Sequence, residues 1–125
     1  LLELGETRSL LDQMAPCLVP GDVLQIQEQI GRVHQSEALL EYVQDLLDFT
    51  RTSSHFMVGL SPRAGLALLR AARSWAALHG RDHALPEDLQ MVMPYVAGHR
   101  LRSADTYSEL SRDRLTEVLR EIPVP

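Results

Sequence analysis

The fold is decided by the stretch Gly59-Leu60-Ser61-Pro62-Arg63-Ala64-Gly65 and by the Ala- and Leu-rich run that follows it, residues 66–79. Ser61 is predicted to be the N-cap of a helix and Pro62 its first residue, and Gly80 is a typical helix stop. The run is apolar almost all round, which is typical of a helix surrounded by others. We therefore expect residues 62–79 to form the central helix of a helical domain.

Arg63 occupies the first turn of this helix, which is an unfavourable place for a cation. The helix dipole puts partial positive charge there, and a cation nearby is disfavoured by about 0.3–1 kcal/mol. An anion held jointly by the guanidinium and by the backbone amides of the first turn would explain the arginine, and phosphate is the obvious anion. The predicted binding residues are Arg63 with its neighbours Ser61, Pro62 and Ala64.

Amphipathic segments precede the central helix. Apolar residues recur at helical spacing over residues 22–34, after the Pro20-Gly21 turn. Ser36 is predicted to cap a second helix and residues 51–58 to form a loop. The inward face of the second helix comprises Leu39, Val43, Leu46, Leu47 and Thr50, and its acidic face of Glu37, Glu41, Asp45 and Asp48 is expected to be solvated.

Two further helices are predicted after the central one. The first begins at Pro86, turns Leu89, Val92, Met93 and Val96 inward, and is expected to be kinked or shortened by Pro94. Residues 98–106 should be irregular. The last helix is capped by Ser111 and ended by Pro123, with Leu115, Val118, Leu119 and Ile122 inward. The predicted fold class is all-α, a small bundle of about five helices over residues 21–125. Residues 1–20 are a connector with a short helix near residues 9–14.

Composition limits the remaining possibilities. The 125 residues with 45% apolar content suit one domain with a buried core. Cys17 is the single cysteine, so no internal disulfide can form; we expect it to be a buried, inert thiol. No apolar run is long enough to span a membrane. The chain starts without Met, and we expect it to come from a longer protein.

The basic charge is concentrated in one segment. The net charge is −5, yet residues 49–81 contain five arginines and no acidic residue. A helix-turn-helix DNA-binding unit over residues 51–81 could use this charge, although an acidic chain argues against nucleic-acid binding. A helical protein-interaction module without a nucleotide role is the more serious alternative. On the central helix, Arg70 and Arg73 are interpreted as residues of its solvent edge.

The sequence lacks the residues of a complete nucleotide-hydrolysing site. A P-loop ends in lysine followed by Ser or Thr, and this chain contains no lysine. No apolar strand ending in paired acids is present to hold a metal. His79 and His83 are four apart, but Gly80 should end the helix between them, so no metal site is expected. By itself the chain is therefore not expected to hydrolyse ATP or to retain a cofactor.

Five motifs resemble, in order and spacing, the C-terminal lid of MoxR-family AAA+ ATPases. The likeness is good over residues 20–101, and residues 33–40 within that range also fit the family's pattern. Residues 122–125 resemble it as well, whereas residues 1–19 match only loosely. The motifs are Gly59-Leu60-Ser61-Pro62-Arg63-Ala64, Leu68-Leu69-Arg70-Ala71-Ala72-Arg73, Gly80-Arg81-Asp82, Pro86-Glu87-Asp88-Leu89 and Gly98-His99-Arg100-Leu101.

The resemblance implies a role for the chain within a larger assembly. Arg63 would be the sensor 2 arginine, which reaches the terminal phosphates of ATP from the lid. The full-length protein would bind ATP with Mg²⁺ between its AAA+ core and this lid. It would form a ring, commonly a hexamer, in the cytoplasm and act as a chaperone-like factor. Its partners would be its own core, neighbouring subunits and von Willebrand A-domain proteins, without a membrane span.

Overall fold

The computed structural model describes residues 10–125, and they form a helical domain with one very small sheet. A helical turn covers residues 10–13 of the predicted connector. The labelled elements are α2 (Pro20–Arg32), β1 (His34–Gln35), α3 (Glu37–Thr52), α4 (Pro62–Leu78), β2 (His83–Ala84), α5 (Pro86–Ala97) and α6 (Arg112–Leu119). The predicted all-α class is confirmed.

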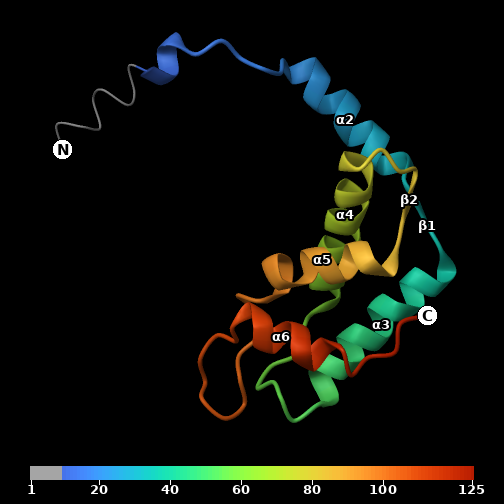
Figure 1. Ribbon diagram of the computed structural model, residues 1–125, viewed down its shortest axis with the longest axis vertical. Coiled ribbons are helices and arrows are strands. Elements are labelled where there is room, and N and C mark those ends of the chain that lie inside the picture. Colours follow the sequence, from blue (N-terminus) through green and yellow to red (C-terminus); the bar gives the residue numbers. More distant parts are fainter. Residues whose placement is uncertain (1–9) are drawn as a thin grey trace.

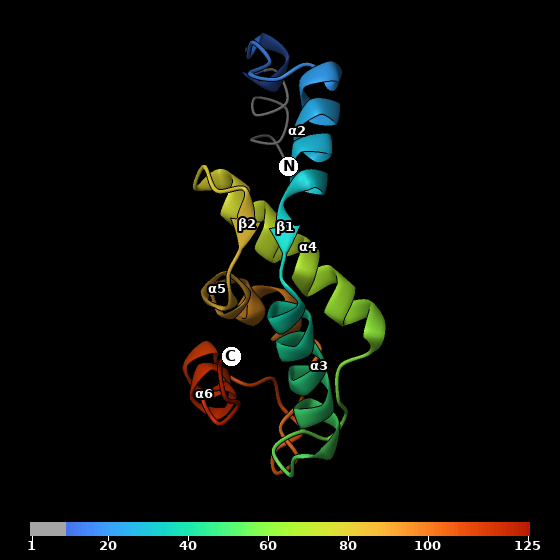
Figure 2. The ribbon, with the colours of Figure 1, turned by 90° about the vertical axis from the view of Figure 1, so that its right-hand side faces the viewer.

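Helix α4 is the centre of the domain, as its apolar sequence predicts. It packs against α2, α3, α5 and β2, and α5 crosses it in Figure 1 and lies beside it in Figure 2. Ala64, Leu68, Ala72 and Ala76 form a stripe along α4, each 1% exposed or less. Because three of these four side chains are methyl groups, neighbouring backbones can approach α4 closely.

The predicted inward and outward faces agree with the structure, but several helix ends do not. All five inward residues of α3 are buried, and its four acidic residues are exposed. However, α3 continues through Arg51 to Thr52, where a loop was predicted. The first amphipathic helix spans residues 20–32 rather than 22–34, because His34 belongs to β1.

Proline has less effect on the last two helices than the sequence suggests. Helix α5 runs through Pro94 to Ala97, so Pro94 itself does not end the helix, and the irregular stretch begins at Gly98, as predicted. Helix α6 ends at Leu119, before Pro123. Tight turns continue from there, with Glu121 N–H donating to Val118 O and Ile122 N–H to Leu119 O, both at 3.2 Å. These turns keep Ile122 buried, as predicted.

Strands β1 and β2 form a parallel pair that the sequence does not reveal. His34 lies opposite His83 and Gln35 opposite Ala84, and the His34 N–H donates to Asp82 O at 2.7 Å. Two residues are too few to display the alternation by which a strand is recognised in a sequence. The pair fixes the segment after α2 beside the turn between α4 and α5 (Figure 2).

An ion pair fixes the turn between α4 and α5. Gly80 has φ 71°, the left-handed conformation that commonly ends a helix. Arg81 then donates two hydrogen bonds to Asp88, of 2.6 and 2.5 Å, and the Leu85 N–H donates a third of 2.8 Å. Burial acts to raise the pKa of Asp88, but these hydrogen bonds outweigh it and hold the pKa below its ordinary value.

Helix α2 is the least integrated part of the described chain. None of its residues is buried, and it extends away from the bundle (Figures 1 and 2). Val23 and Ile26 of its predicted apolar face are each 41% exposed. Cys17, just before α2, is also exposed, so the prediction of a buried thiol is wrong. The chain there has no packed neighbour to cover it.

Candidate functional site

The start of α4 has the predicted capping geometry. Ser61 is extended, with φ −79° and ψ 159°, and Pro62 is at the first helical position. The Ser61 hydroxyl accepts a hydrogen bond from Ala64 N–H at 3.3 Å. Since Pro62 has no N–H and Ala64 N–H is bonded to Ser61, the Arg63 N–H is the donor of the first turn for which residues 10–125 supply no partner. Arg63 thus offers both a backbone and a side-chain donor.

Two residues of α3 hold the segment that leads into this helix start. The Thr50 hydroxyl donates to Leu47 O at 2.9 Å and accepts from Leu60 N–H at 3.0 Å. Arg51 Nε donates to Leu60 O at 3.1 Å. A Cβ on Gly59 would lie 2.7 Å from the Arg51 Cα, so only glycine allows this close passage. The position of Ser61-Pro62-Arg63 is therefore set by α3.

The Arg63 side chain is exposed and unpaired. Within residues 10–125 its guanidinium makes no hydrogen bond or ion pair. It borders a shallow hollow of about 520 Å³ that is otherwise lined by Leu66, Ala67 and Arg70. The side chain of Arg70 is also without an ion pair in the described chain. The hollow is positively charged and open, which suits an anion that approaches from outside.

An apolar groove lies beside this hollow, between α3 and α4. It has a volume of about 440 Å³ and shares Leu66, which is 59% exposed, with the hollow. Arg51 is its single charged lining residue. The remaining lining residues are Leu40, Val43, Gln44, Leu47, Pro62, Gly65 and Leu69. The start of α4 thus combines cationic and apolar surface without any carboxylate.

The other candidate residues on and after α4 are placed differently. Arg70 is exposed, as predicted. Arg73 is not a solvent-edge residue: it is half-buried and donates a hydrogen bond to Gly31 O at the end of α2. His79 Nδ1 is 2.8 Å from Trp75 O, and His83 Nδ1 is 2.8 Å from Asp82 Oδ1. Among the described residues no group of three or more His, Cys, Asp or Glu side chains could hold a metal ion.

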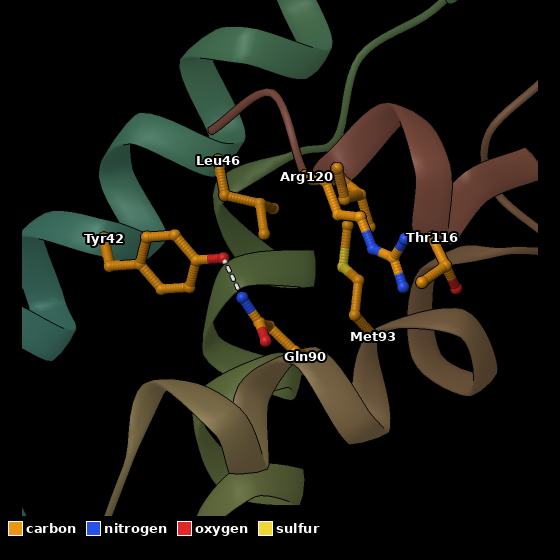
Figure 3. Close-up of a pocket in the computed structure, with 7 residues that line it drawn as sticks. Tyr42, Leu46, Gln90, Met93, Thr116 and Arg120 are labelled. Carbon is orange, nitrogen blue, oxygen red and sulfur yellow. Dashed lines mark hydrogen bonds between the residues drawn. The ribbon is translucent and has the colours of Figure 1, made fainter. Parts of the chain in front are cut away.

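A second pocket, remote in the sequence from Arg63, lies among α3, α5 and α6. Figure 3 shows Tyr42 and Arg120 approaching it from opposite sides. Gln90 Nε2 donates to the Tyr42 hydroxyl at 3.1 Å. The volume is about 140 Å³, and Leu46, Met93, Thr116 and Leu119 complete the lining. The lining has no carboxylate, histidine or cysteine, and Tyr42 and Arg120 are its ionisable side chains.

Sequence reasoning identified Arg63 but missed the residues that position it. Thr50 was predicted only to face the core, and Arg51 was placed in a loop. The available signal was a buried threonine at the end of an apolar face, which needs a hydrogen-bond partner. Arg73 carried no signal, because its partner is a backbone carbonyl more than 40 positions away.

The comparisons with known proteins agree with this fold. Residues 48–122 match the family model described as "AAA lid domain", which is more than half of the chain. No helix among residues 10–125 is long and apolar enough to cross a membrane.

Three of the relatives that the chain matches carry the name MoxR. The chain is 34% identical to the chaperone MoxR1 of Mycobacterium tuberculosis over 86% of its length, covering 30% of that protein. It is 34% identical to the protein MoxR of Paracoccus denitrificans over 74% of its length, covering 32% of that protein. A solved structure from Cytophaga hutchinsonii, assigned as an ATPase, is 30% identical and has a TM-score of 0.72; the match covers 82% of this chain and 34% of that one.

The chain therefore belongs to the AAA lid domain family, as the C-terminal lid of a MoxR-type AAA+ ATPase. It spans about a third of the length of these relatives.

Proposed function

We propose that Arg63 is the sensor 2 arginine of this lid, and that it contacts the terminal phosphate of ATP in the full-length protein. The observation that carries the proposal is the exposed Arg63 guanidinium at the start of α4, which, like the Arg63 backbone N–H beside it, has no partner within residues 10–125. Both donors are suited to a phosphate oxygen. Ser61, Pro62 and Ala64 act by shaping this helix start.

The residues of the site fit a phosphate and do not by themselves fit its metal. No carboxylate lines the hollow around Arg63 or the adjacent groove. Mg²⁺ prefers carboxylate and phosphate oxygens, so its protein ligands would come from outside this chain. The part of this chain is to supply a cation and an N–H on a rigid helix, while the apolar groove offers a surface for a neighbouring segment. The chain alone is not expected to hydrolyse ATP or to retain a cofactor.

We also propose which residues form the lid and in what kind of assembly it works. Residues 21–125 would be the lid, and residues 1–20 the connector from an AAA+ core. The full-length protein would form a ring, commonly a hexamer, in the cytoplasm and act as a chaperone-like factor on other proteins. Its own core and neighbouring subunits would be its first partners, with von Willebrand A-domain proteins beyond them. The named chaperone MoxR1 among the relatives supports the chaperone part.

The test compares Arg63→Ala in the full-length protein and in the isolated chain. A charge-assisted hydrogen bond contributes about 1.5–3 kcal/mol. ATP affinity or turnover should therefore fall about 10- to 100-fold in the full-length variant. In the isolated chain the melting temperature should stay the same or rise slightly, because the arginine opposes the helix dipole.

Arg120→Ala is the matched control, because Arg120 is another exposed arginine and lies outside the hollow around Arg63. Arg120→Ala should change neither the ATP affinity or turnover of the full-length protein nor the melting temperature of the isolated chain. If Arg63→Ala unfolds the chain, or leaves ATP binding and turnover intact, Arg63 is a structural residue. The alternative of an interaction module without a nucleotide role would then be favoured.

A further inference from the structure

Arg73 joins α4 to α2, a helix that packs against α4 but contributes no buried residue. Its guanidinium Nη2 donates to Gly31 O, in the last turn of α2. The last carbonyls of a helix have no intrahelical partner and carry partial negative charge. A cation is the preferred partner there, so Arg73 satisfies a carbonyl of α2 and complements the helix dipole at the same time.

The environment of Arg73 shows that stability alone is a weak reason for this residue. Its Nε is buried and has no hydrogen-bond partner in the described chain. Burying an unsatisfied polar group is unfavourable, and an apolar side chain of similar length would avoid that cost. No described carboxylate pairs with Arg73. What the arginine provides, and methionine could not, is a directional bond to the end of α2.

Arg63 and Arg73 lie on the same helix. They are ten residues apart, which at 1.5 Å per residue places them about 15 Å apart along α4. The buried stripe of α4 makes this helix the rigid centre of the domain. A displacement of its first turn is therefore transmitted to Arg73 with little loss.

We propose that Arg73 is a positioning residue that clamps the end of α2 to α4, so that α2 moves with the nucleotide-contacting helix as one rigid body. This inference rests on the proposed function of Arg63. Apart from Arg73, the described links of α2 to the bundle are few: α2 has no buried residue, and the β1–β2 pair follows it directly. Without the clamp, the unburied contact of α2 with α4 and the β1–β2 pair remain, and they restrict the angle of α2 less tightly.

The experiment measures the angle of α2 in the full-length protein. Spin labels at Gln25→Cys on α2 and Met91→Cys on α5, both exposed positions, are introduced with Cys17→Ser and with any other cysteines removed. Pulsed electron spin resonance then gives the distribution of label distances with and without a non-hydrolysable ATP analogue. ATP affinity and turnover are measured on the same variants without the labels.

We expect Arg73→Met to broaden the distance distribution and to reduce turnover about five-fold, with ATP affinity unchanged within about two-fold. Arg73→Lys, which keeps a cation and an N–H donor, should restore a narrower distribution and part of the turnover. Arg120→Met is the control and should match the unmodified protein in every readout. In the isolated chain, Arg73→Met should shift the melting temperature by less than about 2 °C.

The inference is overturned if Arg73→Met keeps a narrow distance distribution, whatever its turnover. It is also overturned if Arg73→Met weakens ATP binding as much as Arg63→Ala does, because Arg73 would then act at the nucleotide. Should Arg73→Met fail to fold, Arg73→Leu takes its place: it also removes the donor to Gly31 O and must broaden the distribution, and an unchanged width in that variant rejects the clamp. If Arg63→Ala leaves ATP binding and turnover intact while Arg73→Met broadens the distribution, the sensor proposal fails and the clamp remains.

Discussion

Thr50 shows how one side chain can determine where a distant functional residue lies. It is 1% exposed, and its hydroxyl is both a donor to Leu47 O and an acceptor from Leu60 N–H. The second bond fixes the backbone one residue before Ser61. Thr50 therefore contributes to the site without touching any ligand.

We predict that Thr50→Val destabilises the isolated chain by about 1–3 kcal/mol, because valine has the same shape but leaves the buried Leu60 N–H unsatisfied. Urea unfolding followed by circular dichroism measures the change. Thr52→Val is the matched control: the Thr52 hydroxyl donates only to Asp48 O, at an exposed site. Its effect should stay within about 0.5 kcal/mol. Equal effects of the two substitutions would contradict the importance of the Thr50–Leu60 bond.

Residues whose partners are local in the sequence were predicted, and residues with distant partners were not. The cap by Ser61 and the exposure of Arg63 follow from the positions next to them. The contact of Arg73 with Gly31 and the contact of Thr50 with Leu60 depend on how helices are placed, which no local pattern encodes. Cys17 was predicted to be buried from its apolar neighbours, but those neighbours are themselves exposed.

Among the elements, α3 and α4 approach each other at Gly65. A Cβ at this position would lie 2.9 Å from Leu47 Cδ1 and 3.4 Å from Val43 Cγ1. The lack of a side chain allows the two helices to pack at the base of the α3–α4 groove. Gly65 is thus a packing residue in a helix interior, where glycine is otherwise unfavourable.

We predict that Gly65→Val lowers the free energy of unfolding by about 1–3 kcal/mol, because the branched side chain overpacks the α3–α4 contact. The control is Gly31→Ala in α2, where an added Cβ meets nothing within 4 Å. That substitution should raise the helicity of α2 and stabilise the chain by up to about 1 kcal/mol, since alanine is the better helix former. Both values are obtained from chemical denaturation. If Gly65→Val leaves the free energy of unfolding unchanged, α3 and α4 can move apart without loss of stability.

At the scale of elements, helices were predicted better than their ends. The capping residues Ser36, Ser61 and Ser111 are all in place, because each needs only a serine hydroxyl and the N–H three residues later. The end of α3 was missed because Arg51 and Thr52 look like loop residues while their side chains bond to backbone oxygens. The β1–β2 pair was missed because a strand pair of two residues is stabilised by the residues packed around it, and those contacts cannot be read from the two short segments themselves.

For the whole molecule, the main feature is that the helices of the bundle bury apolar side chains and α2 buries none. An isolated helix of 13 residues is marginal in water, and α2 contributes no buried residue. In the full-length protein, the proposed AAA+ core would be the first candidate to cover its apolar face.

We predict that the amides of residues 21–26 exchange with solvent at least about 100-fold faster than those of the middle of α4 in the isolated chain. Hydrogen–deuterium exchange with peptide-level mass spectrometry measures this, with α5 as an internal reference. In the full-length protein the same amides should be protected more strongly. Equal protection of α2 and α4 in the isolated chain would show that α2 is stable by itself.

The parallel pair of β1 and β2 also has a consequence for the order of folding. It joins residues about 50 positions apart, and all of α3 and α4 lies between them. Closing a loop of that length has an entropic cost that two residues of pairing cannot offset alone. The α3–α4 contact shortens the effective loop, so the strands should pair only after those helices have met. Pairing of β1 with β2 is then a late step of folding, and the segment after α2 reaches its final place last.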